Sequence, residues 1–113
     1  FKAAVRESCK KRGVEYVAEK INSIPPIRMS SEVEDGLEQA AKKLGISSRR
    51  MPSGAGHDSM SFADICDTGM VFIPCRGGIS HNPSEHTEIS SICDGARVMY
   101  EYLKTVASLQ GQE

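Results

Sequence analysis

The chain has 113 residues, enough for one small domain but not for a large enzyme core. Its 14 Lys and Arg residues nearly balance its 15 Asp and Glu residues, for a formal net charge of -1, so charge predicts neither nucleic acid nor a membrane surface as a partner. No apolar run is long enough to cross a bilayer, and no signal-peptide pattern opens the sequence.

Four cysteines occur without Cys-x-x-Cys spacing, which argues against a zinc ribbon. The chain is also not cysteine-dense, so we expect reduced thiols and a cytoplasmic location. Because the first residue is Phe1 rather than Met, we expect a piece of a longer protein.

Residues 1–12 predict a helix that ends at Gly13. Its apolar stripe at four-residue spacing consists of Phe1, Val5 and Cys9. Residues 14–24 carry Val, Tyr and Ile without helix signals, which favours a strand. Pro25-Pro26 then interrupts any regular element, so it is the best position for a domain boundary or hinge.

The next predicted helix begins at Ser31, which forms a capping box with Glu34, and ends at Gly45. Its apolar stripe consists of Val33, Leu37, Ala40, Ala41 and Leu44. Residues 46–51 are short and basic, and we interpret them as an edge strand in which Arg49-Arg50 is a solvated charge run.

The second half predicts a short helix over residues 58–66 and a strand over residues 69–74 that is covered on both faces of a parallel sheet. A long helix follows from about Glu88, with Thr87 as its cap. Its apolar stripe consists of Ile89, Ile92, Cys93, Ala96, Met99, Tyr100 and Leu103. The alternation of helix and strand predicts an α/β layer.

A glycine-rich turn, Ser53-Gly54-Ala55-Gly56, precedes His57 and has almost no side-chain bulk. Such a turn lets a ligand approach the backbone and accept hydrogen bonds from its N–H groups, so a carboxylate would suit it. The alternative is an ordinary tight turn, which composition alone favours. A lone histidine such as His57 is more often a structural or surface residue than a catalytic one.

A second glycine-rich turn, Gly77-Gly78-Ile79-Ser80, leads into His81 directly after the predicted strand. Ligands of parallel α/β sheets bind beyond the carboxyl ends of strands, where a metal-binding imidazole is expected. Glu85 lies four residues on and is placed to orient that ring. A loop histidine with a solvated glutamate explains the same position equally well. We expect His86 to face solvent.

A hydrolytic zinc site needs at least three protein ligands, and a two-metal site needs more. The sequence contains no His-x-Asp, no His-Glu-x-x-His and no Glu-Glu pair. A complete two-metal centre therefore cannot be assembled from one copy of this chain, and no general base is identifiable.

Three strings occur in order: Gly54-Ala55-Gly56-His57-Asp58, Gly69-Met70-Val71-Phe72-Ile73-Pro74 and Gly78-Ile79-Ser80-His81-Asn82-Pro83-x-Glu85-x-Thr87. This arrangement resembles the C-terminal part of the hydantoinase/carbamoylase branch of the aminoacylase and carboxypeptidase-G-like metallohydrolases. The branch includes N-carbamoyl-L-amino acid hydrolases, allantoate amidohydrolase and β-ureidopropionase-type enzymes. The resemblance covers residues 53–87 by motif and the flanking helices by pattern only.

Enzymes of this branch have a two-metal catalytic domain interrupted by a smaller lid domain that mediates dimerisation. The resemblance implies that residues 1–27 are the end of the lid and the hinge, and that residues 28–113 are the returning segment of the catalytic domain. The implied fold class is α/β, a fragment of a two-layer or three-layer α/β catalytic domain preceded by the end of an α+β lid.

The resemblance also implies roles for single residues. His81 matches the last metal ligand of the family, and Asp58 and Glu85 match positions that support the ligands. The matching substrate-binding turn is Ser53, Gly54, Ala55, Gly56 and His57, with Gly56 the foremost contact. No catalytic residue has a counterpart here. Cys75 and Ser59 depart from the family pattern, which has serine and alanine there.

The function implied by the resemblance is metal-dependent hydrolysis of linear C–N bonds in N-carbamoyl or ureido acids. In the full-length parent, two divalent ions (zinc, manganese, cobalt or nickel) would activate water against the substrate, and a separate glutamate would shuttle the proton. We expect the fragment alone to bind no metal stably, to lack turnover and to form a homodimer or otherwise self-associate. The alternatives are an aminoacylase or dipeptidase of the same superfamily and a non-catalytic assembly module.

Overall fold

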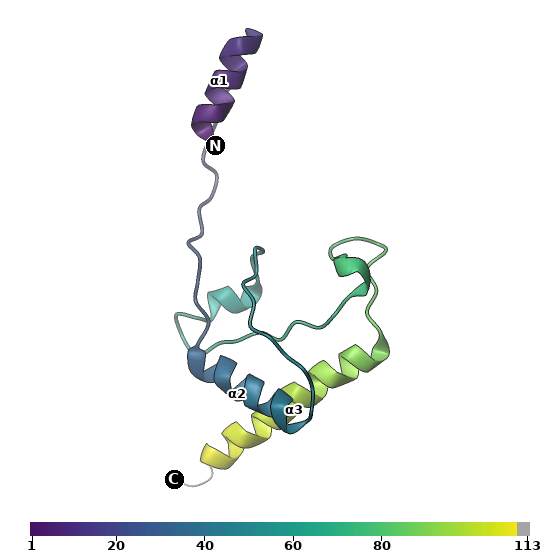
Figure 1. Ribbon diagram of the computed structural model, residues 1–113. Helices are drawn as coiled ribbons and strands as arrows, with labels where there is room; N and C mark the ends of the chain where they lie inside the picture. The colour runs from purple at the N-terminus through teal and green to yellow at the C-terminus, as the bar shows by residue number, and fades with distance from the viewer. Residues whose placement is uncertain (111–113) are drawn as a thin grey trace.

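The computed structural model describes residues 1–110 and is elongated, with principal extents of 68 × 36 × 20 Å (Figure 1). Its elements in chain order are α1 (Lys2–Arg12), α2 (Ser31–Lys43), the short 3₁₀ helices η1 (Asp58–Ser61) and η2 (Arg76–Gly78), and α3 (Ile89–Gln110). Figure 1 shows α2 and α3 packed together, while α1 stands away from them. Within the described part, no helix combines the length and the hydropathy that crossing a membrane requires.

The first helix ends where the sequence predicts. Gly13 adopts a left-handed conformation (φ 64°), and the N–H groups of Gly13 and Val14 donate to the carbonyls of Lys10 and Cys9. Glycine suits this position because a side chain would strain the left-handed backbone. No residue of α1 is buried, and Phe1 is fully exposed, so the predicted apolar stripe has no covering partner among residues 1–110.

Residues 14–30, which we call the linker, run as an irregular chain from α1 to α2 (Figure 1). The strand predicted over residues 14–24 is therefore wrong. A strand needs a neighbour to complete its hydrogen-bond ladder, and from residue 15 to residue 29 the linker makes no backbone hydrogen bond to another described segment. Its apolar side chains remain exposed, including Val17 and Ile21 at more than nine-tenths.

Helix α2 begins at Ser31 as predicted, but its cap is Ser30, because Ser31 is already the first helical residue. The Ser30 hydroxyl accepts from the Val33 N–H at 3.5 Å, and the Ser30 N–H donates to the Thr68 carbonyl at 2.9 Å. The cap thus also fixes the helix start to a segment 38 residues further along the chain, since 68 − 30 = 38. The prediction that the helix ends at Gly45 is confirmed, with a φ of 70° at that residue.

The core lies between α2 and α3 and is small. Its buried apolar members are Ala40, Ala41 and Val98, surrounded by the half-buried side chains of Leu37, Leu44, Ile46 and Tyr102. The predicted stripe of α2 therefore does face the core. Gly36 allows the close approach of the helices, because a Cβ there would lie 2.5 Å from Cε2 of Tyr102.

The stripe predicted for α3 is wrong as a buried face. Within residues 89–108 of α3, the buried side chains are Val98 and Glu101, whereas Ile89, Ile92, Met99, Tyr100 and Leu103 are at least half exposed. In the described part, α2 and one irregular segment cover α3 incompletely. Met99 and Leu103 line an open groove beside α2 and Val71, and they stay about half exposed there. The helix begins at Ile89, and the Glu88 carbonyl accepts from Ser91 and Ile92, so Glu88 and not Thr87 occupies the cap position.

Residues 69–74, the crossing segment, run across both helices without forming the predicted strand. A Cβ on Gly69 would lie 2.6 Å from Val33 of α2, and one on Gly95 of α3 would lie 2.6 Å from Ile73. The peptide groups of the crossing segment make no backbone hydrogen bond to another described segment. The segment therefore occupies a second layer over the helices, but no ladder converts it into a sheet.

The remaining predictions are corrected in the same way. Residues 46–51 form no strand, and of the helix predicted over residues 58–66 only Asp58–Ser61 is helical, as a 3₁₀ turn. The described part of the chain is thus helical and irregular, without a strand.

Candidate functional site

The first candidate region is the glycine turn, residues 52–57, which side-chain hydrogen bonds hold in shape. The Ser53 hydroxyl lies 2.7 Å from Nε2 of His57 and accepts from the Ala55 N–H at 3.2 Å. The His57 ring is half-buried and meets the Phe72 ring edge-on, with centroids 5.5 Å apart and an interplanar angle of 67°. The turn is therefore attached to the crossing segment through His57.

The two glycines of this turn face open space. A Cβ built on Gly54 or Gly56 meets no atom within 4 Å, and the N–H groups of both make no hydrogen bond within the described residues. The backbone is therefore accessible to a ligand, as a carboxylate-binding turn requires. The predicted substrate-binding residues all lie together here, and they are Ser53, Gly54, Ala55, Gly56 and His57. Their contact with substrate stays a prediction.

The second candidate region is the histidine loop, residues 76–86. Its ends meet where the Arg76 N–H donates to the His86 carbonyl at 2.8 Å. Glu88 strengthens this closure, because its Oε1 lies 2.8 Å from Nη2 of Arg76 and 3.4 Å from Nε2 of His86. Left-handed backbone inside the loop occurs at Gly77 (φ 65°) and Gly78 (φ 68°). The loop is closed at its base, and His86 is exposed as expected.

His81 lies near the tip of the histidine loop with an exposed imidazole. Its φ of 55° makes it the non-glycine residue with left-handed backbone in the described chain. This conformation is uncommon for a side-chain-bearing residue, although histidine adopts it more readily than most. Glu85 holds it, since its Oε2 accepts from the His81 N–H at 2.8 Å. Glu85 thus positions the main chain of His81 rather than its ring.

The structure does not bring the two histidines into one centre. Figure 1 shows the glycine turn and the histidine loop rising from the same side of the helix pair and separated from each other. Among residues 1–110, no group of three or more His, Cys, Asp or Glu side chains is placed to hold a metal ion. The exposed His81 ring is accessible as a single ligand, and Asp58 is exposed at the start of η1, so both predicted roles stay predictions.

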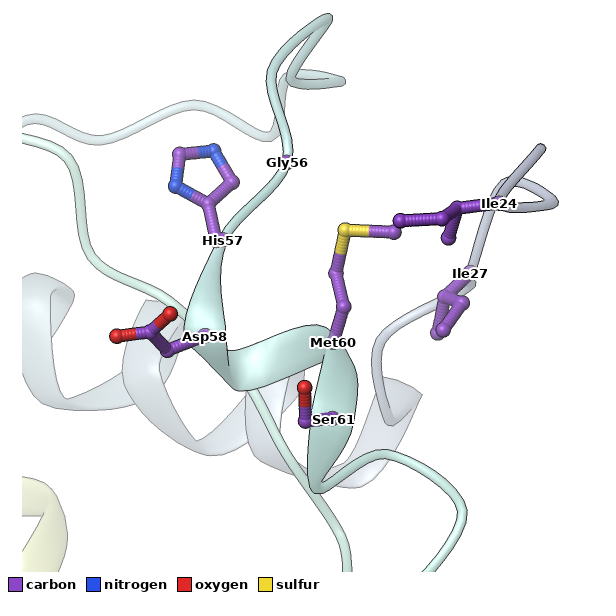
Figure 2. Close-up of a pocket in the computed structure, with 7 residues that line it drawn as sticks. All are labelled: Ile24, Ile27, Gly56, His57, Asp58, Met60 and Ser61. Atoms are coloured by element: carbon purple, nitrogen blue, oxygen red, sulfur yellow. The ribbon is translucent and has the colours of Figure 1, made fainter. Parts of the chain in front are cut away.

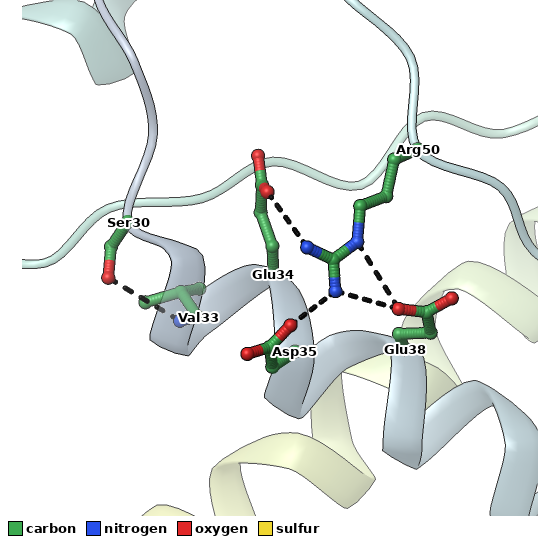
Figure 3. A network of polar contacts seen from close by, with 6 residues as sticks. All are labelled: Ser30, Val33, Glu34, Asp35, Glu38 and Arg50. Atoms are coloured by element: carbon green, nitrogen blue, oxygen red, sulfur yellow. Dashed lines mark hydrogen bonds and ion pairs between the residues drawn. The ribbon is translucent and has the colours of Figure 1, made fainter.

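Sequence reasoning missed a cluster that fixes the approach to the glycine turn (Figure 3). Arg50 forms ion pairs with three carboxylates on one face of α2: Glu34 at 3.4 Å, Glu38 at 2.7 Å, and Asp35. The hydrogen bonds that Arg50 donates to Asp35, and then those to Glu38, raise the pKa of Arg50 above its ordinary value. Arg50 is thus exposed, as expected for a solvated charge run, and is also ion-paired. The spacing of the three acids within five residues was a signal for a cation opposite them.

Comparison with known proteins extends these observations. Residues 4–105 match the peptidase family M20/M25/M40. The chain is 46% identical to the N-carbamoyl-L-amino-acid amidohydrolase of Pseudomonas sp. strain NS671, over 80% of this chain and 22% of the relative. It is 34% identical to the N-carbamoyl-L-amino-acid amidohydrolase of Paenarthrobacter aurescens, over 90% of this chain and 25% of the relative. Allantoate amidohydrolase of Bacillus subtilis strain 168 is 30% identical, over 93% of this chain and 26% of the relative.

The chain therefore spans about a quarter of the length of these relatives. The family is generally metal-dependent and has an α/β catalytic fold, of which the described residues contribute helices and irregular segments. The resemblance drawn from the three sequence strings is confirmed, because the match covers nearly all of the chain. The chain belongs to the peptidase family M20/M25/M40.

Proposed function

We propose that this chain is the C-terminal part of a metal-dependent amidohydrolase that cleaves linear C–N bonds of N-carbamoyl or ureido acids. The observation that carries the proposal is an open glycine turn and an exposed, backbone-constrained His81 in a chain 46% identical to an N-carbamoyl-L-amino-acid amidohydrolase. The names of the other relatives, N-carbamoyl-L-amino-acid and allantoate amidohydrolases, support the same bond type.

In this proposal, His81 ligates one of two divalent metal ions, which are zinc, manganese, cobalt or nickel. Imidazole is a preferred ligand of zinc and nickel in this set, and an exposed ring at a loop tip is accessible to such an ion. The remaining ligands come from other parts of the protein, since residues 1–110 hold no further cluster. When bound, the metal supplies Lewis-acid polarisation of the substrate carbonyl and an activated water.

The role of the glycine turn is to bind the substrate carboxylate through backbone N–H groups, with Gly56 foremost. The absence of Cβ atoms lets the carboxylate approach the main chain. The Ser53–His57 hydrogen bond keeps the turn open before substrate arrives, so less ordering is needed on binding.

We further propose that the protein self-associates, most simply as a homodimer, and that it is cytoplasmic. The exposed apolar side chains of α3 and the unpaired peptide groups of the crossing segment support self-association, because such surfaces favour pairing with another chain. Residues 1–27 are proposed as the end of a lid domain with its hinge, and α1 standing away from the helix pair agrees with that division.

The test compares His81→Ala with His86→Gln in the full-length protein that contains this chain. N-carbamoyl amino acids, allantoate and dipeptides serve as substrates, and metal content is measured by mass spectrometry. We expect His81→Ala to lose metal and at least about 10²-fold in kcat, whereas His86→Gln keeps a hydrogen-bonding group beside Glu88 and retains both.

Full metal content and activity in His81→Ala would contradict the proposed ligand. Turnover of dipeptides without turnover of carbamoyl or ureido acids would favour the aminoacylase or dipeptidase alternative. We expect no turnover from the 113-residue chain alone, so a hydrolytic rate from it that depends on His81 would also overturn the proposal.

A further inference from the structure

A cavity of about 330 Å³ lies between the linker and the start of η1 (Figure 2). It brings together two parts of the chain that are far apart in sequence, the end of the linker and the stretch from the end of the glycine turn through η1. Its volume is at the lower end of the range for small-molecule sites, which suits a ligand the size of a single amino acid. The lining residues are Ile24, Ile27, Gly56, His57, Asp58, Met60 and Ser61.

One wall of this cavity is apolar. Figure 2 shows the Met60 side chain extending from η1 toward Ile24, with Ile27 beside them. The intervening Pro25-Pro26 restricts the backbone and favours the polyproline II conformation, in which residues three apart share a side. Ile24 and Ile27 are three apart, so the prolines preset both isoleucines to face the same way.

The opposite edge of the cavity is polar and belongs to the glycine turn. Gly56 contributes backbone without a side chain, and His57 contributes a half-buried imidazole held by Ser53. The Asp58 carboxylate points away from Ile24 and Met60 in Figure 2, so it leaves the apolar wall free of charge. The cavity therefore offers a polar edge, at the Gly56 backbone and the His57 ring, beside an apolar wall.

We propose that Ile24, Ile27 and Met60 form the side-chain specificity pocket, and that it selects N-carbamoyl amino acids with aliphatic side chains. This inference rests on the proposed function. An acid whose carboxylate lies on Gly56 places its side chain toward the linker and Met60. Aliphatic groups are favoured there because apolar contacts replace water. A ureido acid whose substituents are all polar, such as allantoate, would desolvate those groups against isoleucine and methionine without hydrogen bonds.

The experiment measures kcat/KM of the full-length protein for N-carbamoyl-L-leucine and for N-carbamoylglycine, which lacks a side chain. We expect Ile24→Ala and Met60→Ala each to lower the leucine-to-glycine ratio about tenfold, the effect typical of lost apolar contact in a specificity pocket. Ile21→Ala is the matched control, because Ile21 lies on the same linker, is exposed and does not line the cavity. It is expected to leave the ratio unchanged.

An unchanged ratio in both Ile24→Ala and Met60→Ala, in a protein that still hydrolyses N-carbamoylglycine, would overturn the inference and leave the proposed function standing. If the protein hydrolyses no carbamoyl compound, the proposed function fails, and binding of 4-methylpentanoate against acetate, measured by calorimetry, tests the pocket by itself. Preference for 4-methylpentanoate that Ile24→Ala abolishes supports the pocket, and equal binding of the two acids refutes it.

Discussion

Substitution of Gly69 by alanine tests whether the crossing segment is packed onto α2 as closely as the structure shows. A Cβ at this position would lie 2.6 Å from Cγ1 and 3.3 Å from Cβ of Val33. Carbon atoms in contact lie about 3.5–4.0 Å apart, so the segment must move by roughly 1 Å. Val33 cannot rotate away easily, because β-branched side chains in helices keep one rotamer. The segment is also held beside Gly69, where the Thr68 carbonyl accepts from Ser30.

The expected magnitude combines two opposing effects. Overpacking of this kind costs about 1–3 kcal/mol. Replacing glycine by alanine returns about 0.4–1 kcal/mol by restricting the unfolded chain, since no left-handed φ at Gly69 opposes a side chain. We expect a net loss of about 1–2 kcal/mol in the free energy of unfolding. For a slope near 2 kcal/mol per molar of urea, the unfolding midpoint falls by roughly 0.5–1 M.

The assay is urea unfolding followed by circular dichroism at the helix band. Gly54→Ala is the matched control, because its Cβ would meet nothing within 4 Å, and we expect a change within about 0.5 kcal/mol. Adding Val33→Ala to Gly69→Ala should remove the steric part of the loss, as a double-mutant cycle. The reasoning is refuted if Gly69→Ala is as stable as the wild type, or if its cost is the same with and without the Val33 side chain.

Two further predictions concern charged groups. Arg50→Ala releases residues 46–51 from the acidic side chains of α2, so thermolysin should cleave that region faster in limited proteolysis, most of all at low ionic strength. Arg50→Lys should restore only part of the protection, because lysine cannot pair with several carboxylates at once. Equal cleavage rates in Arg50→Ala and the wild type would contradict the role of the cluster. The second concerns Glu101, whose pKa is lowered below its ordinary 4.5 by hydrogen bonds from Lys104 and Lys43. The contribution of ionised Glu101 to stability is therefore present above pH 4.5 and lost as the pH falls through its lowered folded-state pKa. Glu101→Gln should reduce the melting temperature at neutral pH, and the two melting temperatures should converge in acid. A constant difference in melting temperature across pH would refute this.

The ends of helices α1 and α2 and the buried face of α2 could be predicted because their sequence signals are local. Gly13 and Gly45 end their helices, and the stripe of α2 faces the core, since caps and periodicity act within one or two turns of a helix. The cap of α2 was assigned to Ser31 instead of Ser30 because both serines are good caps, and only the contact with Thr68 distinguishes them.

The strands could not be predicted correctly because a strand is defined by its neighbours. Residues 69–74 have the apolar composition of a buried strand and pack against two helices, yet no described segment pairs with their peptide groups. The stripe of α3 shows the same limit, since periodicity identifies an apolar face without identifying what covers it. The exposed Met99 and Leu103 lie on such a face.

The candidate site shows the same contrast between local signals, which could be predicted, and contacts between distant residues, which could not. Motif order located the glycine turn and His81, but the bonds that shape them, Ser53 to His57 and Glu85 to the His81 backbone, depend on side-chain geometry that spacing alone does not fix. The acids clustered on α2 indicated a cation opposite them, but the ion pairs of Arg50 were missed because it lies 12–16 residues away, outside the reach of local charge patterns.

The closure of the histidine loop at its base has a consequence for engineering. Its two ends are joined by one backbone hydrogen bond of 2.8 Å, from Arg76 to His86, and by the Glu88 carboxylate, which contacts both side chains. None of residues 76–86 is buried. Such a segment can be exchanged as a cassette with the corresponding loop of a relative while the helix pair beneath it stays folded. Under the metal-binding role proposed for His81, chimeras of this kind would transfer ion preference between family members without redesign of the scaffold.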